Sequence, residues 1–156
     1  MKAAKALGIF AFGLAIEWLW STCWTVFGLS PCLLLVLTVA IASYAGPVAG
    51  QCYGFFWGLF LDVLGAHTFG AGALALTLVG YCVGVIKRQM DVSSPPSQVM
   101  VVALVSLAYA VFLGLAGLVF ERRFLWGGWA LFIGGPLYNC LVAPPIFFVV
   151  RKVLEL

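Results

Sequence analysis

Residues 31–64 form one continuous apolar stretch in which Asp62 is the only charged residue. A helix that crosses a bilayer needs about 20 apolar residues, so this stretch is too long for a single crossing and predicts two helices. The segment YAGP at residues 44–47 is the best place for the break, because proline fits the first turn of a new helix. We therefore expect one helix over residues 31–45 and the next over residues 48–64.

The composition places these helices in a membrane. Of the 156 residues, 65% are hydrophobic and 8% are charged, whereas an ordinary soluble domain has about 25% charged residues. Eight Lys and Arg and five Asp and Glu residues cannot provide the polar surface that a soluble domain needs. The sequence predicts an all-α integral membrane protein whose outer surface is covered by lipid.

Apolar stretches suitable for membrane helices occur six times along the chain. The second and third are short for a hydrocarbon core about 30 Å thick. The predicted helices cover residues 6–25, 31–45, 48–64, 68–86, 98–120 and 126–150. The only appreciable hydrophilic connection is KRQMDVSSPPS, which begins at Lys87. We expect a six-helix transmembrane bundle that forms a single domain over residues 1–156.

The basic residues predict the orientation of this bundle. They form four pairs, Lys2/Lys5, Lys87/Arg88, Arg122/Arg123 and Arg151/Lys152. With six crossings and a cytoplasmic amino terminus, three pairs lie inside and one outside, as the positive-inside rule favours. We therefore expect a multi-pass protein with both termini in the cytoplasm. The pairs are too dispersed for a nucleic-acid surface.

A stripe of small residues marks the predicted helix over residues 48–64. Gly50, Gly54, Gly58 and Asp62 follow one another at intervals of four, and residues four apart lie on one face of a helix. Glycines at this interval allow two membrane helices to approach closely. The stripe predicts either a packing seam inside the bundle or a groove that receives a helix of another protein.

Asp62 is the charged member of this stripe. An uncompensated carboxylate in the bilayer is costly, by about 2.5–3.5 kcal/mol at the centre, so it normally has a partner. An ion pair or a helix cap at the following turn is one interpretation, with His67, Arg122 and Arg123 as candidate ion-pair partners. Contact with a partner protein, or proton or ion coupling, are the alternatives.

Two more polar residues lie inside apolar helices. Glu17 has no obvious cationic partner within the membrane, and it is expected to be protonated or to face a polar cavity. Asn139 lies in a helix with Pro136, Pro144 and Pro145, which predict a bend. The Asn139 side chain is expected either to cap carbonyls freed by the prolines or to bond across to another helix.

Catalytic signatures are missing from the sequence. It contains one histidine, no HExxH motif, no P-loop and no cysteine cluster of the kind that binds zinc. We therefore expect no enzymatic activity, no metal and no cofactor. The five cysteines are scattered through apolar segments and are interpreted as small apolar residues. Only a disulfide between Cys23 and Cys32 is left open.

The segment GFFWGLFLDVLGAHTFGAGALALTLVGYCVG at residues 54–84 resembles the MreD family. The resemblance lies in a GxxxGxxxD pattern, a short turn, the pair Phe69-Gly70 and a helix with regularly placed glycines. Asn139, a proline-containing last helix and a basic carboxyl end agree with it. These motifs cover about a third of the chain and consist mainly of small and apolar residues, so their specificity is moderate.

This resemblance implies a bacterial inner-membrane scaffold for cell elongation. Such a protein would bind the single-pass protein MreC and link MreB filaments to the peptidoglycan synthase RodA and a class B penicillin-binding protein, with homodimer formation left open. It also implies a fold similar to the substrate-capture subunits of energy-coupling-factor transporters. Partner-binding or packing roles would fall on Gly50, Gly54, Gly58, Asp62 and Gly70.

The similarity in fold leaves one alternative function, the capture of a vitamin-sized molecule for a transporter. Ala11 and Ala15 form a small-xxx-small pair that suits docking to a transporter coupling subunit. The predicted external loops are short and poor in polar groups, which argues against closure over a vitamin.

Overall fold

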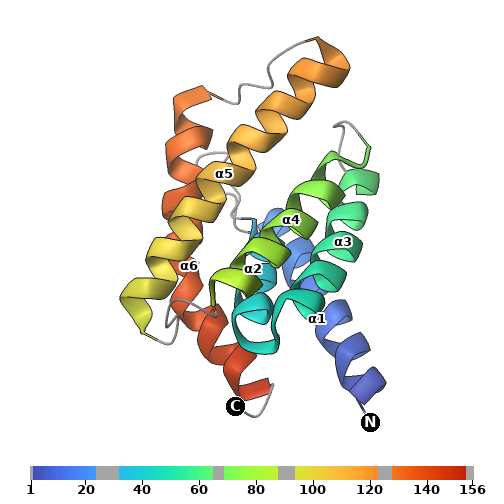
Figure 1. The fold of residues 1–156 in the computed structure, drawn as a ribbon, viewed down its shortest axis with the longest axis vertical. Helices are drawn as coiled ribbons and strands as arrows, with labels where there is room; N and C mark the ends of the chain where they lie inside the picture. Colours follow the sequence, from blue (N-terminus) through green and yellow to red (C-terminus); the bar gives the residue numbers. More distant parts are fainter. Residues whose placement is uncertain (1, 24–31, 65–68, 88–93, 123–127, 154–156) are drawn as a thin grey trace.

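The computed structural model describes residues 2–23, 32–64, 69–87, 94–122 and 128–153. Its elements within these ranges are all helices, which confirms the all-α class and the six predicted helices (Figure 1). They are α1 (Lys2–Cys23), α2 (Leu33–Ala45), α3 (Pro47–Leu64), α4 (Ala71–Ile86), α5 (Pro95–Glu121) and α6 (Gly128–Val153).

The break between α2 and α3 lies where the sequence predicts it. Gly46 has a φ of 95°, a positive value that glycine adopts without steric cost, and its amide bonds to the Ala42 carbonyl. Pro47 then opens α3. The prediction for the start of α5 was three residues late, because Pro95 and Pro96 fit the first helical turn and extend the helix toward Ser94.

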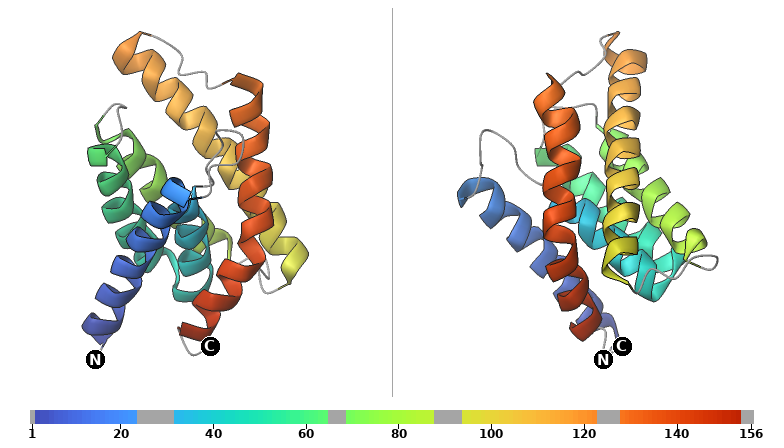
Figure 2. Two further views of the ribbon diagram at one scale, coloured as in Figure 1. Left: turned by 180° about the vertical axis from the view of Figure 1, so that it is seen from behind. Right: turned by 90° about the vertical axis from the view of Figure 1, so that its left-hand side faces the viewer.

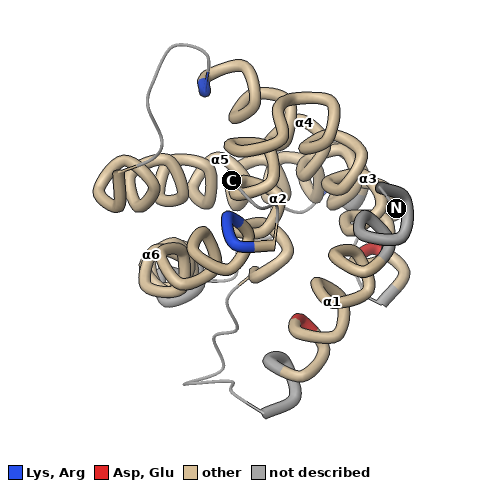
Figure 3. Tube along the Cα trace, turned by 90° about the horizontal axis from the view of Figure 1, so that it is seen from below, with Lys and Arg blue, Asp and Glu red and all other residues tan. Residues whose placement is uncertain are grey.

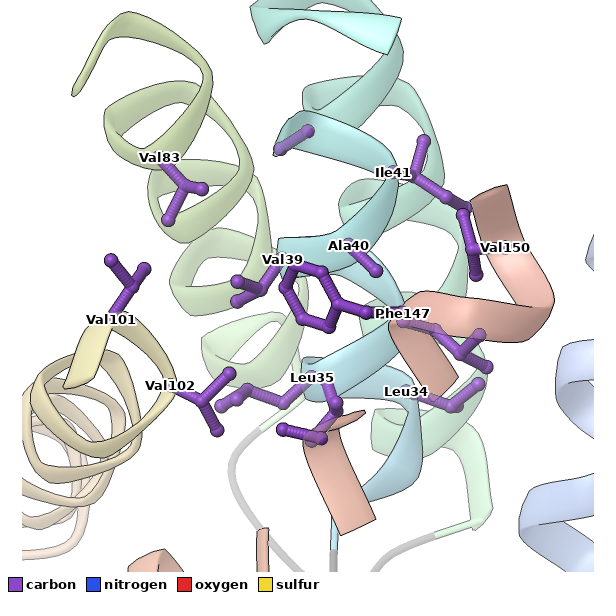
Figure 4. Packing of buried hydrophobic residues seen from close by; sticks show 14 of the residues in the cluster. Leu34, Leu35, Val39, Ala40, Ile41, Val83, Val101, Val102, Phe147 and Val150 are labelled. Atoms are coloured by element: carbon purple, nitrogen blue, oxygen red, sulfur yellow. The ribbon is translucent and has the colours of Figure 1, made fainter. Parts of the chain in front are cut away.

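The short helix α2 is the centre of the bundle. Every residue from Leu33 to Ser43 is buried, and α2 contacts each of the other five helices. Figure 4 shows its side chains meeting those of three neighbours, among them Val83 of α4, Val102 of α5 and Phe147 of α6. A helix that is apolar on all sides is expected in such an interior position.

The other helices surround α2 in a simple arrangement. The chain forms two hairpins, α3 with α4 and α5 with α6, whereas α1 packs within the described chain on α2 and α3 alone. Figure 2 shows α1 crossing the bundle obliquely and α6 bending toward its carboxyl end. The amino-terminal end of α1 and the carboxyl-terminal end of α6 lie at the same end of the bundle.

Two of the helices are long and apolar enough to cross a membrane. The qualifying segments are Pro95–Phe120 in α5 and Phe132–Val153 in α6. By contrast, α2 has 13 residues and would extend for only about 20 Å at the usual rise per residue. This short helix lies inside the bundle, where the neighbouring helices cover it.

Candidate functional site

The glycine stripe of α3 lies directly against the backbone of α4. A Cβ built on Gly50 would lie 2.8 Å from the Gly80 carbonyl oxygen, and one on Gly58 would lie 2.5 Å from the Ala73 Cα. A Cβ on Gly54 would overlap the Leu76 carbonyl in the same way. The two backbones touch because no side chain separates them, which is the arrangement that small residues permit in membrane helices.

Glycines of α4 continue this contact from the other side. A Cβ on Gly80 would overlap the backbone of Gly50, and one on Gly84 would overlap Pro47. The groove along α3 is therefore filled by α4 of the same chain. This geometry supports the interpretation of the stripe as an internal seam and leaves no free groove there for a helix of another protein.

Asp62 caps the amino-terminal end of α4. Its carboxylate accepts hydrogen bonds from the backbone amides of Gly70 (3.0 Å), Gly72 (3.0 Å) and Ala73 (2.9 Å). The first amides of a helix have no partner within the helix and carry a partial positive charge, so a carboxylate is well placed there. Gly70 suits this turn, since its φ is 94°.

The ion-pair interpretation of Asp62 differs from what the structure shows. Its carboxylate is 8% exposed and bonds to backbone amides, and it makes no ion pair with Arg122, which lies at the end of α5. His67 and Arg123 lie outside the described residues. Of the expected ion pair or helix cap, the structure therefore forms the cap, with three backbone donors.

Glu17 holds the first turn of the central helix. Its Oε2 accepts a hydrogen bond of 3.2 Å from the backbone amide of Leu34. The carboxylate thus occupies the positive end of α2, as Asp62 does for α4. This backbone donor takes the place of the polar cavity that was one expectation for Glu17, and the other expectation, protonation, stays a prediction.

Asn139 bonds across helices, which is one of the two roles expected for it. Its Oδ1 accepts from the backbone amide of Cys32 at 3.0 Å, and its Nδ2 donates to the Ser106 hydroxyl at 3.0 Å. Asn139 is 4% exposed and Ser106 is 3% exposed. The side chain therefore joins α6 to both α2 and α5.

Three further contacts escaped the sequence interpretation. Trp57 is fully buried, stacks on Phe10 of α1 and donates from Nε1 to the Phe10 carbonyl at 3.3 Å. The Lys87 ammonium donates to the Tyr44 carbonyl at 2.7 Å, at the carboxyl end of α2. Ser106 completes the Asn139 contact. A tryptophan, lysine or serine carries no signal in the sequence that would reveal a partner so distant along the chain.

The chemistry available to these residues is structural. Glu17, Asp62 and Asn139 each bond to the first amides of another helix. Within the described ranges, no three His, Cys, Asp or Glu side chains converge as metal ligands would. Cys32 is a free thiol, and the Cys23 side chain, its candidate disulfide partner, lies outside the described residues. The site is therefore best described as a set of hydrogen bonds that hold the helices together.

Comparison with known proteins identifies the family of this chain. No curated protein and no solved structure matches the sequence. A family model does match, over residues 5–156, and its description is rod shape-determining protein MreD. The match covers the chain almost completely, including residues 5–45, which lie outside the motifs that carry the sequence resemblance. The chain therefore belongs to the MreD family of membrane proteins, which has a role in rod-shape determination.

Proposed function

We propose that this protein is a non-enzymatic membrane scaffold of the cell-elongation complex, which binds MreC and couples MreB filaments to the peptidoglycan synthase. The family match supports the general role. The observation that carries the scaffold proposal is that Glu17, Asp62 and Asn139 each hold one helix against another. A protein built in this way presents rigid helix faces to its partners.

The orientation proposed for this scaffold has both termini in the cytoplasm of a bacterial inner membrane, with six crossings. Lys87 lies at the same end of the bundle as the carboxyl end of α2, because it bonds to Tyr44 there. Arg151 and Lys152 occupy the last turn of α6, and the view from below in Figure 3 shows a blue, basic segment on the helix beside the carboxyl terminus. The positive-inside rule assigns this end to the cytoplasm.

The alternative of a vitamin-capture subunit has less support. The first amides of α2 and α4, which could otherwise bind an anionic group, are occupied by the protein's own Glu17, Asn139 and Asp62 side chains. A likeness of the bundle to capture subunits of energy-coupling-factor transporters stays a prediction, since no solved structure matches the chain.

Native mass spectrometry tests the proposal. The tagged protein is extracted from the membranes of its own host in mild detergent, and an unrelated multi-pass protein with the same tag is purified in parallel. We expect a complex that contains a single-pass protein of MreC type in the first sample and not in the second. A vitamin-sized mass together with a transporter coupling subunit, without MreC, would contradict the scaffold and favour the capture function.

A further inference from the structure

The attachment of α1 differs from that of the other helices. Within the described chain α1 contacts only α2 and α3, whereas α2 contacts all five of its neighbours. Its apolar side chains Ile9, Phe10 and Leu14 pack on the core, and two contacts are more specific. Phe10 stacks on Trp57 of α3, and Glu17, about two turns beyond Phe10, bonds to Leu34 of α2.

Of these two contacts, the one made by Glu17 can carry a charge and depends on it. A carboxylate attracts the positive end of a helix and accepts stronger hydrogen bonds than a neutral acid does. When a proton binds, the net charge disappears and part of that attraction is lost. The contact at Trp57 consists of aromatic packing and a neutral hydrogen bond, so it does not change with protonation.

No basic side chain of α2 or α3 is available to form an ion pair with the Glu17 carboxylate and so to oppose its protonation. Neither α2 nor α3 contains a lysine, arginine or histidine, and the one acid of α3, Asp62, is bonded to the amides of α4. The ionisable groups that interact with Glu17 from neighbouring elements are the Cys32 thiol at the start of α2 and the Tyr109 phenol of α5. Asn139 of α6, which bonds to the adjacent Cys32 amide, does not titrate.

From this geometry we propose that Glu17 is a proton-responsive latch. Its carboxylate holds the carboxyl-terminal half of α1 on the first turn of α2. Protonation of Glu17 releases that half, while the contact with Trp57 keeps the amino-terminal half of α1 in place. The bundle around α2 is unaffected, because Asn139 and Asp62 fasten the other helices independently of Glu17. The latch would change the face that α1 presents within the membrane. It concerns the bundle alone and holds with or without MreC.

Distance measurements between spin labels test the latch directly. One label is placed at Trp18→Cys on α1, where the side chain is 69% exposed, and the other on the exposed native Cys82 of α4, with the remaining cysteines replaced by alanine. Pulsed electron paramagnetic resonance is recorded in lipid nanodiscs from about pH 8 to about pH 4, a range that brackets the ordinary pKa of a glutamic acid. We expect a second, longer distance to gain population by roughly threefold to tenfold as the pH falls.

The variant Glu17→Gln provides the decisive comparison. Because glutamine keeps the shape and an acceptor oxygen but no charge, we expect the longer distance at every pH. Tyr109→Phe and Asp62→Asn, which leave Glu17 in place, should retain the pH response. A distance that does not change with pH in the parent protein would overturn the latch, and so would a pH response that persists unchanged in Glu17→Gln. Even if Glu17→Gln does not fold, the pH titration of the labelled protein that keeps Glu17 shows whether the distance responds to pH.

Discussion

The carboxylate of Asp62, near the end of α3, accepts a hydrogen bond of 2.9 Å from the backbone amide of Ala73 in the first turn of α4. The glycine seam begins beside this bond, where Gly58 meets the same Ala73. The cap fixes the start of α4, and the seam then fixes its distance from α3. Together they make the α3–α4 hairpin one rigid unit of the bundle.

Replacing Asp62 with alanine should destabilise the protein. The variant leaves the three amides of Gly70, Gly72 and Ala73 without their acceptor, and we expect a loss of about 1–3 kcal/mol. Asp62→Asn keeps one acceptor oxygen and should lose less. Unfolding midpoints in detergent would measure both effects. Equal midpoints for the alanine variant and the parent protein would show that the cap does not contribute to stability.

Replacing Gly58 with leucine should separate α3 from α4. Because a Cβ there would lie 2.5 Å from the Ala73 Cα, the backbones must move apart and the packing of the seam is lost. We expect a large fall in thermal stability, with any loss of partner binding as a consequence. Gly8→Ala is the matched control, since nothing lies within 4 Å of its Cβ. If Gly58→Leu were as stable as that control, the seam would not be a tight contact in solution.

Asn139 and Ser106 should act as a coupled pair. Both are buried and bond to each other at 3.0 Å. Truncating either to alanine removes the same hydrogen bond, so the double variant should cost less than the sum of the single variants, by about 0.5–1.5 kcal/mol. A double-mutant cycle on unfolding free energies measures this coupling. Strictly additive effects would mean that the hydrogen bond does not contribute in the folded protein.

Trp57 should be the main apolar anchor of α1. Its side chain is fully buried and stacks on Phe10 with ring centroids 6.0 Å apart. Trp57→Ala removes a large buried side chain and should cost about 3–5 kcal/mol, whereas Trp57→Phe removes mainly the bond to the Phe10 carbonyl and should cost about 1 kcal/mol. Limited proteolysis of α1, compared between the two variants, would show whether the alanine variant releases that helix. Similar proteolysis of both would contradict an anchoring role.

The sequence by itself determined the class of the protein and the order of its helices. Long apolar stretches with few charges lead to membrane helices because lipid offers the backbone no hydrogen bonds. The pair Gly46-Pro47 ended one helix and began the next, since both residues act through their own backbone conformation. Local rules of this kind can be read without knowing any neighbour.

Only the tertiary structure decided which groups Glu17 and Asn139 bond to, and that Asp62 forms the expected helix cap and not the ion pair. Their partners are backbone amides at the starts of other helices, and an amide is the same at every residue except proline, so no side chain in the sequence marks it. The central place of α2 was equally hidden. Its residues are apolar on every side, which fits burial in protein as well as contact with lipid, and only the packing of five helices around it distinguishes the two.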